Sequence, residues 1–383
     1  MGRKKMTIWT FGLTLFGALT MSWLAERLRL PTVVGQIGAG IILGPAGFHL
    51  LSDNHSLATW AEVGVLLLMF LAGIESDLGL LKRHARQAVT VALAGVVTPF
   101  VVFLVLGLAL GMTDEKSLFW SVLFSATSVS ITAQILTEYH QVKSDAGATI
   151  LGAAVLDDIL AILMWTVYQT VFGIGEETQR LLWFTILLMV MFLLVLVAIL
   201  LYVLPKILPA IGRLSLPGAV LTFALVIVLL SATLSEKIGL SGAIVAFVVG
   251  VLFSRQKSAA AIEHGVTLIG QTVFIPIFFV NIGLKVTLVG QLANLPLIAL
   301  LTVFAILTKF FGAYFGARLV KVPVRDARVV GVGMVSRGEM AIVIADLALS
   351  AHALSSGHYA MLTLVILLTT IFTPIALKSV LRK

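Results

Sequence analysis

The sequence predicts an all-α polytopic membrane protein with 13 transmembrane helices. Of its 383 residues, 60% are hydrophobic and only 11% are charged, whereas a soluble domain carries about 25% charged residues. Apolar stretches recur along the whole chain, each near the ~20 residues that a helix needs to cross a bilayer. These stretches are continuous and not alternating, so they predict helices and exclude the strands of a barrel.

The individual helices follow from these stretches, taken in order along the chain. The expected segments are 7–25, 31–50, 57–80, 88–111, 117–138, 146–172, 181–203, 217–235, 240–254, 262–283, 292–317, 328–350 and 358–377. The chain has no cysteine, which excludes disulfides and thiolate metal sites. Its net charge of +8 comes from basic residues scattered between the apolar segments, which indicates cytoplasmic loops and not a nucleic-acid site.

The distribution of Lys and Arg predicts the topology. Seventeen of the 26 follow odd-numbered segments or lie at the C-terminus, seven lie on the other side, and Lys309 and Arg337 fall inside segments. The positive-inside rule therefore places the N-terminus outside and the C-terminus in the cytoplasm. Arg3, Lys4 and Lys5 before an apolar run also resemble a signal peptide, which prefers the opposite orientation.

An internal repeat appears when the chain is shifted by 210 positions. The segments from Leu24 to Leu28 and from Leu234 to Ile238 then align, as do Gly40–Leu43 and Gly250–Phe253. The first segment thus has a counterpart, which argues against its removal as a signal peptide. The repeat pairs segments 1–6 with segments 8–13, and paired segments are an odd number apart, so the two halves must be inverted, as is typical of transporters.

The repeat predicts the domain organisation. Residues 1–180 form the first six-helix repeat, residues 181–216 a linker helix, and residues 217–383 the second repeat. Segment 5 is interrupted by Thr127 and Ser128, which align with Arg337 and Gly338 in segment 12, so both segments are expected to be broken helices near a binding site.

Two adjacent carboxylates, Asp157 and Asp158, lie halfway along segment 6. Ionisable residues at such depth are costly and mark functional sites. Mutual repulsion and burial favour protonation of at least one carboxyl. A carboxylate that holds either a proton or a small cation makes the two compete, which is a minimal mechanism for their exchange across a membrane.

Other polar residues inside the segments are candidates for the same site. Lys309 is the natural counter-charge of the aspartates. Thr127 and Ser128 offer oxygen ligands, or alternatively contacts for ordinary helix packing. Arg337 and Glu339 either pair across a broken helix or only stabilise the break.

The helix ends hold weaker candidates. Glu75 and Asp77 form either a cytoplasmic funnel for cations or a solvated loop start, and Asn281 and Lys285 end the matching segment 10 with a weak signal. All seven histidines fall in loops or at segment ends, which disfavours a histidine-based metal site or enzyme inside the membrane.

These motifs together resemble the sodium/proton antiporters of the monovalent cation:proton antiporter-2 family. The likeness covers essentially the whole chain, and its most specific element is Leu156-Asp157-Asp158, together with the segment from Phe70 to Glu75, Lys309 and the segment from Arg337 to Glu339. The resemblance implies a bacterial cell-membrane protein that forms a homodimer, with no cofactor. It also implies a dimerisation domain and a mobile core of segments 4–6 and 11–13, in which segments 5 and 12 cross as broken helices and the core moves like an elevator.

The resemblance also assigns roles to the site residues. Asp158 would be the main carrier of Na⁺ or Li⁺ and of the proton, and Asp157 would form a switchable ion pair with Lys309. Members with two aspartates are electrogenic by this likeness. The main alternative is K⁺/H⁺ exchange on the same fold, and an intramembrane aspartyl protease is the alternative from another class. The protease is disfavoured because its two aspartates should come from different helices.

Overall fold

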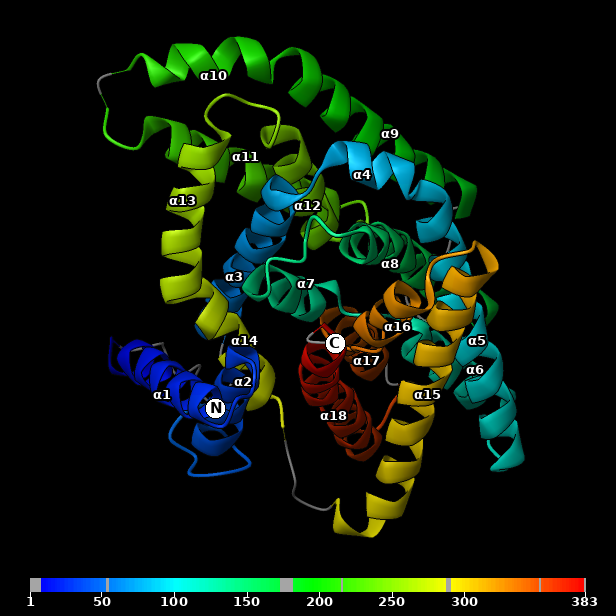
Figure 1. Ribbon diagram of the computed structural model, residues 1–383. Coiled ribbons are helices and arrows are strands. Elements are labelled where there is room, and N and C mark those ends of the chain that lie inside the picture. The colour runs from blue at the N-terminus through cyan, green and yellow to red at the C-terminus, as the bar shows by residue number, and fades with distance from the viewer. Residues whose placement is uncertain are drawn as a thin grey trace.

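The computed structural model describes residues 8–52, 55–172, 182–214, 216–286, 291–350 and 353–381, and these residues form helices joined by short connections (Figure 1). The helices of the first half are α1 (Ile8–Arg27), α2 (Thr32–Leu43), α3 (His55–Glu75), α4 (Leu78–Arg83), α5 (Ala85–Ala109), α6 (Asp114–Ser125), α7 (Val129–Glu138) and α8 (Asp145–Phe172). The middle and second half contain α9 (Leu182–Tyr202), α10 (Leu204–Gly212), α11 (Ala219–Glu236), α12 (Gly242–Phe253), α13 (Ala259–Ile269), α14 (Ile275–Leu284), α15 (Leu295–Leu319), α16 (Val324–Gly333), α17 (Glu339–Ser350) and α18 (Ser356–Leu381).

The helices pack as two bundles. In the first bundle, α3 lies along α12 and α14, and α2 packs between α1 and α14. In the second, α5 lies along α6, α8 and α15, while α16 and α18 pack on α15. Figure 1 shows α9 and α10 along one edge of the molecule. The two bundles meet where α3 contacts α7 and where α2 contacts α18. We call them the α3 bundle and the α5 bundle.

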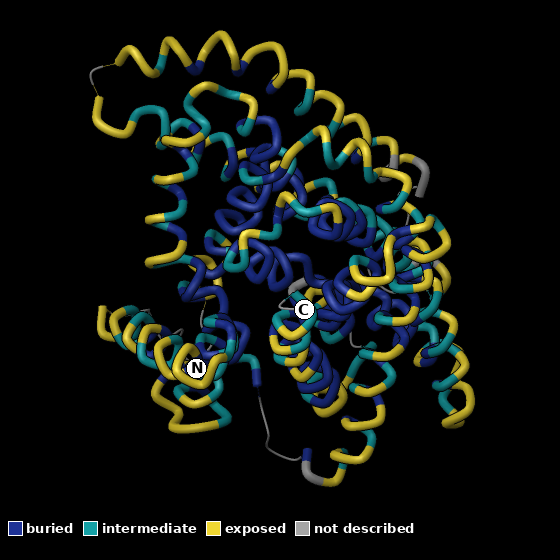
Figure 2. The backbone as a smooth tube through the Cα atoms, viewed as in Figure 1, coloured by how far each residue is buried: buried dark blue, intermediate teal, exposed yellow. Residues whose placement is uncertain are grey.

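The surface is apolar, as a protein in lipid requires. Figure 2 shows the buried residues concentrated at the centre, whereas α9 and α10 are exposed along much of their length. The exposed side chains of α9 include Leu187, Leu194 and Ile199, which are 57%, 59% and 49% exposed. Large exposed apolar areas are rare on soluble monomers, so the outer faces of these helices are suited to contact lipid.

Nine helical stretches of the described residues are long and apolar enough to cross a membrane, or ten if α9 and α10, which meet at 50°, form one span. The thirteen crossings therefore stay a prediction. Two expected segments are shorter than a full crossing. Segment 31–50 contains only the 12 residues of α2, which ends at Leu43 because Gly44 precedes Pro45 and adopts an extended conformation. Helix α12 also has 12 residues.

Two further expectations differ in detail from the structure. Segment 57–80 divides, because α3 ends at Glu75 and Asp77 caps the separate helix α4, its Oδ1 accepting the Gly79 and Leu80 amides at 2.6 and 3.1 Å. Segment 262–283 contains a π-helical turn at Gly270–Phe274. Pro276 follows this turn and has no N–H to donate, so the regular ladder of hydrogen bonds is interrupted there.

The helix boundaries recur along the chain at the offset found in the sequence. Helix α2 (Thr32–Leu43) and α12 (Gly242–Phe253) begin and end 210 residues apart, and so do α5 (Ala85–Ala109) and α15 (Leu295–Leu319). Helices α6 and α16 also begin at this offset, as do α7 and α17.

Four glycines at this offset make reciprocal close contacts between helices. A Cβ added to Gly40 would lie 2.8 Å from the Cα of Gly283, and a Cβ added to Gly250 would lie 3.0 Å from the Cα of Gly73. Gly250 and Gly283 are the positions 210 residues after Gly40 and Gly73. Helix α2 therefore packs on α14 as α12 packs on α3, with backbones as close as small residues allow.

Candidate functional site

Two helix breaks meet in the α5 bundle. Ala126 and Ser128 are extended between α6 and α7, and residues 334–338 separate α16 from α17. The Ser128 N–H donates to the Ser336 carbonyl at 2.8 Å. A Cβ on Gly338 would lie 2.5 Å from the Ser128 Oγ, so only glycine fits there without a shift. Each break thus satisfies backbone groups of the other, which water cannot do inside a membrane.

The composition of the two segments explains why both helices break. Ser and Thr side chains between Ser125 and Thr132 compete with the helix for backbone hydrogen bonds. Thr132 Oγ1, for example, donates to the Gly333 carbonyl at 2.6 Å, which ties α7 to the end of α16. The sequence analysis expected a broken helix in both segments, and this expectation is confirmed by the helix boundaries.

An ion pair lies next to the first break. Lys309 Nζ on α15 is 2.6 Å from Asp157 Oδ2 on α8, and both side chains are 0% exposed. The same ammonium donates to the Ser125 carbonyl at 2.8 Å, where α6 ends. Thr127 Oγ1, in the break, donates a short hydrogen bond to Asp157 Oδ2. Three elements of the fold therefore converge on a single carboxylate oxygen.

The second oxygen of this carboxylate is differently placed. Asp157 Oδ1 is buried and accepts no hydrogen bond from the described residues. Asp158, the next residue of α8, is 2% exposed. The structure thus holds two buried carboxyl groups and one ammonium beside a broken helix, with hydroxyl and carbonyl oxygens nearby. Carboxylate, hydroxyl and carbonyl oxygens are the ligands that hard cations prefer.

Arg337 lies in the second break and is completely buried. Its Nη1 donates to the Val335 carbonyl at 3.1 Å and its Nη2 to the Ala305 carbonyl at 3.3 Å. Among the residues that the structure describes, Arg337 forms no ion pair. Its guanidinium therefore satisfies carbonyls left open by the break. Glu339 begins α17, and its side chain lies outside the described part of the structure.

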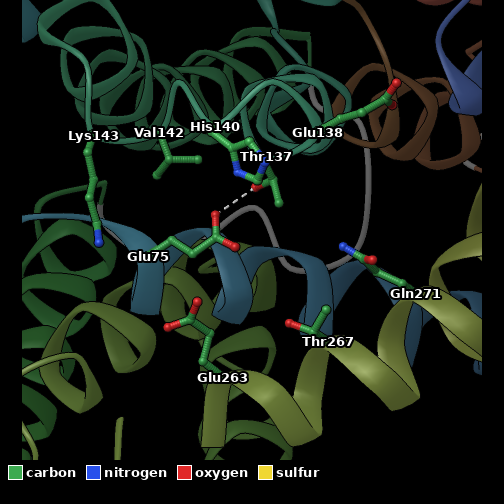
Figure 3. A pocket seen from close by; sticks show the side chains of 9 residues that line it. All are labelled: Glu75, Thr137, Glu138, His140, Val142, Lys143, Glu263, Thr267 and Gln271. Atoms are coloured by element: carbon green, nitrogen blue, oxygen red, sulfur yellow. Dashed lines mark hydrogen bonds between the residues drawn. The ribbon is translucent and has the colours of Figure 1, made fainter. Parts of the chain in front are cut away.

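A cleft of about 540 Å³ lies at the junction of the two bundles (Figure 3). Glu75, at the end of α3, lines it and accepts a hydrogen bond at 3.1 Å from Thr137 of α7. The cleft is lined on the α7 side by Thr137, Glu138, His140, Val142 and Lys143, and on the other side by Glu75, Glu263, Thr267 and Gln271. Asp77, the other funnel candidate, instead caps α4.

Most of the cleft residues were not singled out in the sequence. Glu138 and Glu263 stand at an end of the expected segments 5 and 10, and the basic-residue count places both ends on the side of Glu75. This shared side was the available signal. The sequence does not state that α3, α7 and α13 come together, and that association creates the cleft.

Comparison with known proteins agrees with this architecture. The family model of the transmembrane sodium/hydrogen exchangers matches residues 14–383. A Na⁺/H⁺ antiporter of Enterococcus hirae is 36% identical over 94% of both chains. The Na⁺/H⁺-K⁺ antiporter GerN of Bacillus cereus is 36% identical over 93% of this chain and 91% of its own. The fold is similar to that of the sodium/proton antiporter MjNhaP1 of Methanocaldococcus jannaschii, with a TM-score of 0.72, 16% identity, and 97% and 96% of the two chains covered.

Proposed function

The chain belongs to the family of transmembrane sodium/hydrogen exchangers, and we propose that it exchanges Na⁺ or Li⁺ for H⁺ across the membrane. It is a transporter and not an enzyme, which removes the aspartyl protease alternative. The observation that carries the proposal is the buried ion pair of Lys309 and Asp157 beside a helix break, with the second carboxyl of Asp158 adjacent.

The exchange rests on competition at the two aspartates. We propose that Asp158 binds either the cation or a proton, and that Thr127 and Ser128 supply further oxygens when the cation is bound. Lys309 holds Asp157 in its charged form while the ion pair is intact, since an opposite charge nearby favours ionisation. When a cation enters, Asp157 can exchange its ammonium partner for the cation. Release of the proton from Lys309 would then make the exchange electrogenic.

The supporting residues have distinct parts in this scheme. Arg337 keeps the second break open by holding the carbonyls of Val335 and Ala305, and Glu339 adds a compensating negative charge at the start of α17. Glu75 draws cations into the cleft. Cations collect in a cleft lined by acidic side chains because the field of those side chains lowers their free energy there.

We further propose that the molecule consists of two inverted six-helix repeats. The reciprocal contacts support a two-fold relation, because a two-fold axis makes residue i contact j whenever j contacts i. Gly40 with Gly283 and Gly73 with Gly250 follow this rule. Ser128 and Gly338 lie 210 residues apart and touch each other, as expected for positions next to such an axis. An odd number of crossings between matching helices makes the relation an inversion across the membrane.

This symmetry supports an elevator mechanism. The α5 bundle, which holds the aspartates, would be the mobile core, and the α3 bundle would be the fixed dimerisation domain of a homodimer, with α9 as the linker helix. The cleft at their junction would be the access path in the conformation described. We place the protein in a bacterial cell membrane, with the N-terminus outside and the C-terminus in the cytoplasm.

A second candidate function is K⁺/H⁺ or mixed Na⁺/K⁺ exchange. It is favoured by one observation, the 36% identity to a relative named a Na⁺/H⁺-K⁺ antiporter. The same site would serve, because the carboxylate and hydroxyl ligands bind either ion and the spacing of the ligands sets the preference.

The test uses inside-out vesicles that respiration has acidified, with the lumenal pH followed as Na⁺, Li⁺ or K⁺ is added. We expect Na⁺ and Li⁺ to alkalinise the lumen. Asp158→Asn should abolish the response, whereas Asp145→Asn, at the exposed start of the same helix, should preserve it. No alkalinisation by any of the three cations would refute antiport, and a response to K⁺ as large as that to Na⁺ would support the second candidate.

A further inference from the structure

We infer that Lys285 and Asp346 form the gate at the mouth opposite the cleft, an ion pair that must open whenever the carrier aspartates face that side. The inference rests on the proposed exchange and its moving core. Lys285 follows α14 in the α3 bundle, Asp346 belongs to α17 in the α5 bundle, and their side chains approach to 3.8 Å. The pair therefore joins the two parts that have to move relative to each other.

The position of Lys285 across the membrane follows from the helix that precedes it. Glu263 lines the cleft, and Lys285 comes 22 residues later, directly after the span Ala259–Leu284. At 1.5 Å per helical residue the two positions are roughly 30 Å apart, which is about the thickness of the hydrocarbon core. Lys285 is thus at the far mouth of the bundle junction.

The position of Asp346 agrees. Helices α7 and α17 both start at the point where Ser128 touches Gly338. Helix α7 leads from this point to Thr137, nine residues on, in the cleft. Helix α17 leads to Asp346, eight residues beyond Gly338, where it meets Lys285. Each contact is about 12 to 14 Å along its helix from the breaks, one at each mouth.

The repeat relates the two mouths and shows how they differ. Lys285 occupies the position 210 residues after Glu75, and both residues reach across from the α3 bundle to a helix that begins at a break. The cleft side has an acid bonded to the neutral hydroxyl of Thr137. The far side has a base paired with an acid. The far mouth is therefore latched by a charge pair, while the cleft mouth is negative and open to cations.

A latch of this kind should have a modest strength. The side chains of Lys285 and Asp346 are 23% and 47% exposed, and pairs with this exposure shift an equilibrium by a factor of about 1.5 to 5. Such a pair can bias the core toward the cleft side and still open in every transport cycle.

The main test is to bridge the pair covalently. The chain contains no cysteine, so Lys285→Cys with Asp346→Cys introduces the only two thiols. In vesicles, a short, reducible, bifunctional methanethiosulfonate should bridge them and slow Na⁺/H⁺ exchange about ten-fold or more, because gating motions limit turnover. Reduction should restore the rate. The matched control is His84→Cys with Asp145→Cys, an ion pair within the α5 bundle, whose bridging should leave exchange unchanged.

Charge reversal provides an independent measurement. Lys285→Asp should raise the apparent KM for Na⁺ on the cleft side by about 1.5- to 5-fold with little change in kcat, because fewer molecules then rest in the cleft-open state. The swap Lys285→Asp with Asp346→Lys should return KM toward the wild-type value.

The possible failures are distinguishable. Exchange that continues at full rate after bridging, a swap that behaves like the single reversal, or thiols that cannot be bridged would each overturn the gate. A wild-type chain that moves no cation would instead overturn the proposed function.

Discussion

Lys309 and Asp157 form an ion pair of 2.6 Å between α15 and α8, and neither side chain has any exposed surface. Removing two charges from water costs several kcal/mol per ion, and their attraction offsets this cost only while both partners are present. The carboxylate also accepts a hydrogen bond from Thr127. The pair therefore couples the stability of the α5 bundle to the charge state of the candidate carrier site.

The first prediction concerns this coupling. Lys309→Met leaves a buried carboxylate without its counter-charge and should lower the free energy of unfolding by about 3–5 kcal/mol. Asp157→Asn combined with Lys309→Met should recover most of the loss, because no unpaired charge remains. Thermal unfolding in detergent, measured for the two single variants and the double variant, gives the coupling energy. A double variant no more stable than Lys309→Met alone would contradict the ion-pair argument.

The second prediction concerns the Thr127 hydroxyl. Thr127→Val removes the hydrogen bond to Asp157 and a proposed cation ligand at nearly constant volume, so the apparent KM for Na⁺ should rise about five-fold, the equivalent of about 1 kcal/mol. Thr302→Val is the matched control, because Thr302 bonds to the Ile298 carbonyl of its own helix, at 2.7 Å. Transport assays in proteoliposomes over a range of Na⁺ concentrations measure the effect. Equal KM values for the two variants would refute the role of Thr127.

Much of the helix arrangement was predictable, because hydrophobic length and the positions of charges determine where helices can cross a membrane. The breaks were predictable too, since Thr127 and Ser128 interrupt one apolar run and Arg337 and Gly338 interrupt the other. The lengths of α2 and α12 were less accessible, because they depend on local turns at apolar residues.

Contacts between the two bundles were the least predictable part. Lys285 gave a weak signal in the sequence, and its partner Asp346 lies 61 residues later in another bundle. Nothing in the local sequence of either residue specifies this pairing. The same applies to Glu75 and Thr137, whose contact exists because α3 and α7 meet. Such contacts depend on tertiary packing, and a pattern of hydrophobicity carries no information about them.

The third prediction concerns the close glycine contacts inside the α3 bundle. A Cβ on Gly73 would lie 2.2 Å from the Phe247 carbonyl oxygen, and one on Gly283 would lie 2.2 Å from the Ile37 carbonyl oxygen. Gly73→Ala and Gly283→Ala should therefore each cost about 1–3 kcal/mol through overpacking. Gly12→Ala on α1, where a Cβ meets nothing within 4 Å, is the control and should be close to neutral. Thermal unfolding compares the three, and unequal losses at Gly73 and Gly283 would weaken the two-fold relation.

The fourth prediction separates cation attraction at the cleft from its structure. Glu75→Gln removes the charge, while the amide oxygen can still accept the hydrogen bond from Thr137. The cleft should keep its shape but attract cations less, so the apparent KM for Na⁺ presented on the cleft side should rise about two- to five-fold, with kcat unchanged.

Salt and sidedness make this prediction specific. An electrostatic effect in an open cleft weakens as ionic strength rises, so the KM difference should shrink when choline chloride is added. Na⁺ presented on the other side should show no difference. Glu62→Gln serves as the control, because Glu62 is exposed on the same helix, 13 residues earlier and about 20 Å away. The measurement uses proteoliposomes with Na⁺ supplied from either side, and a KM change that is equal on both sides or insensitive to salt would exclude Glu75 as a collector of cations.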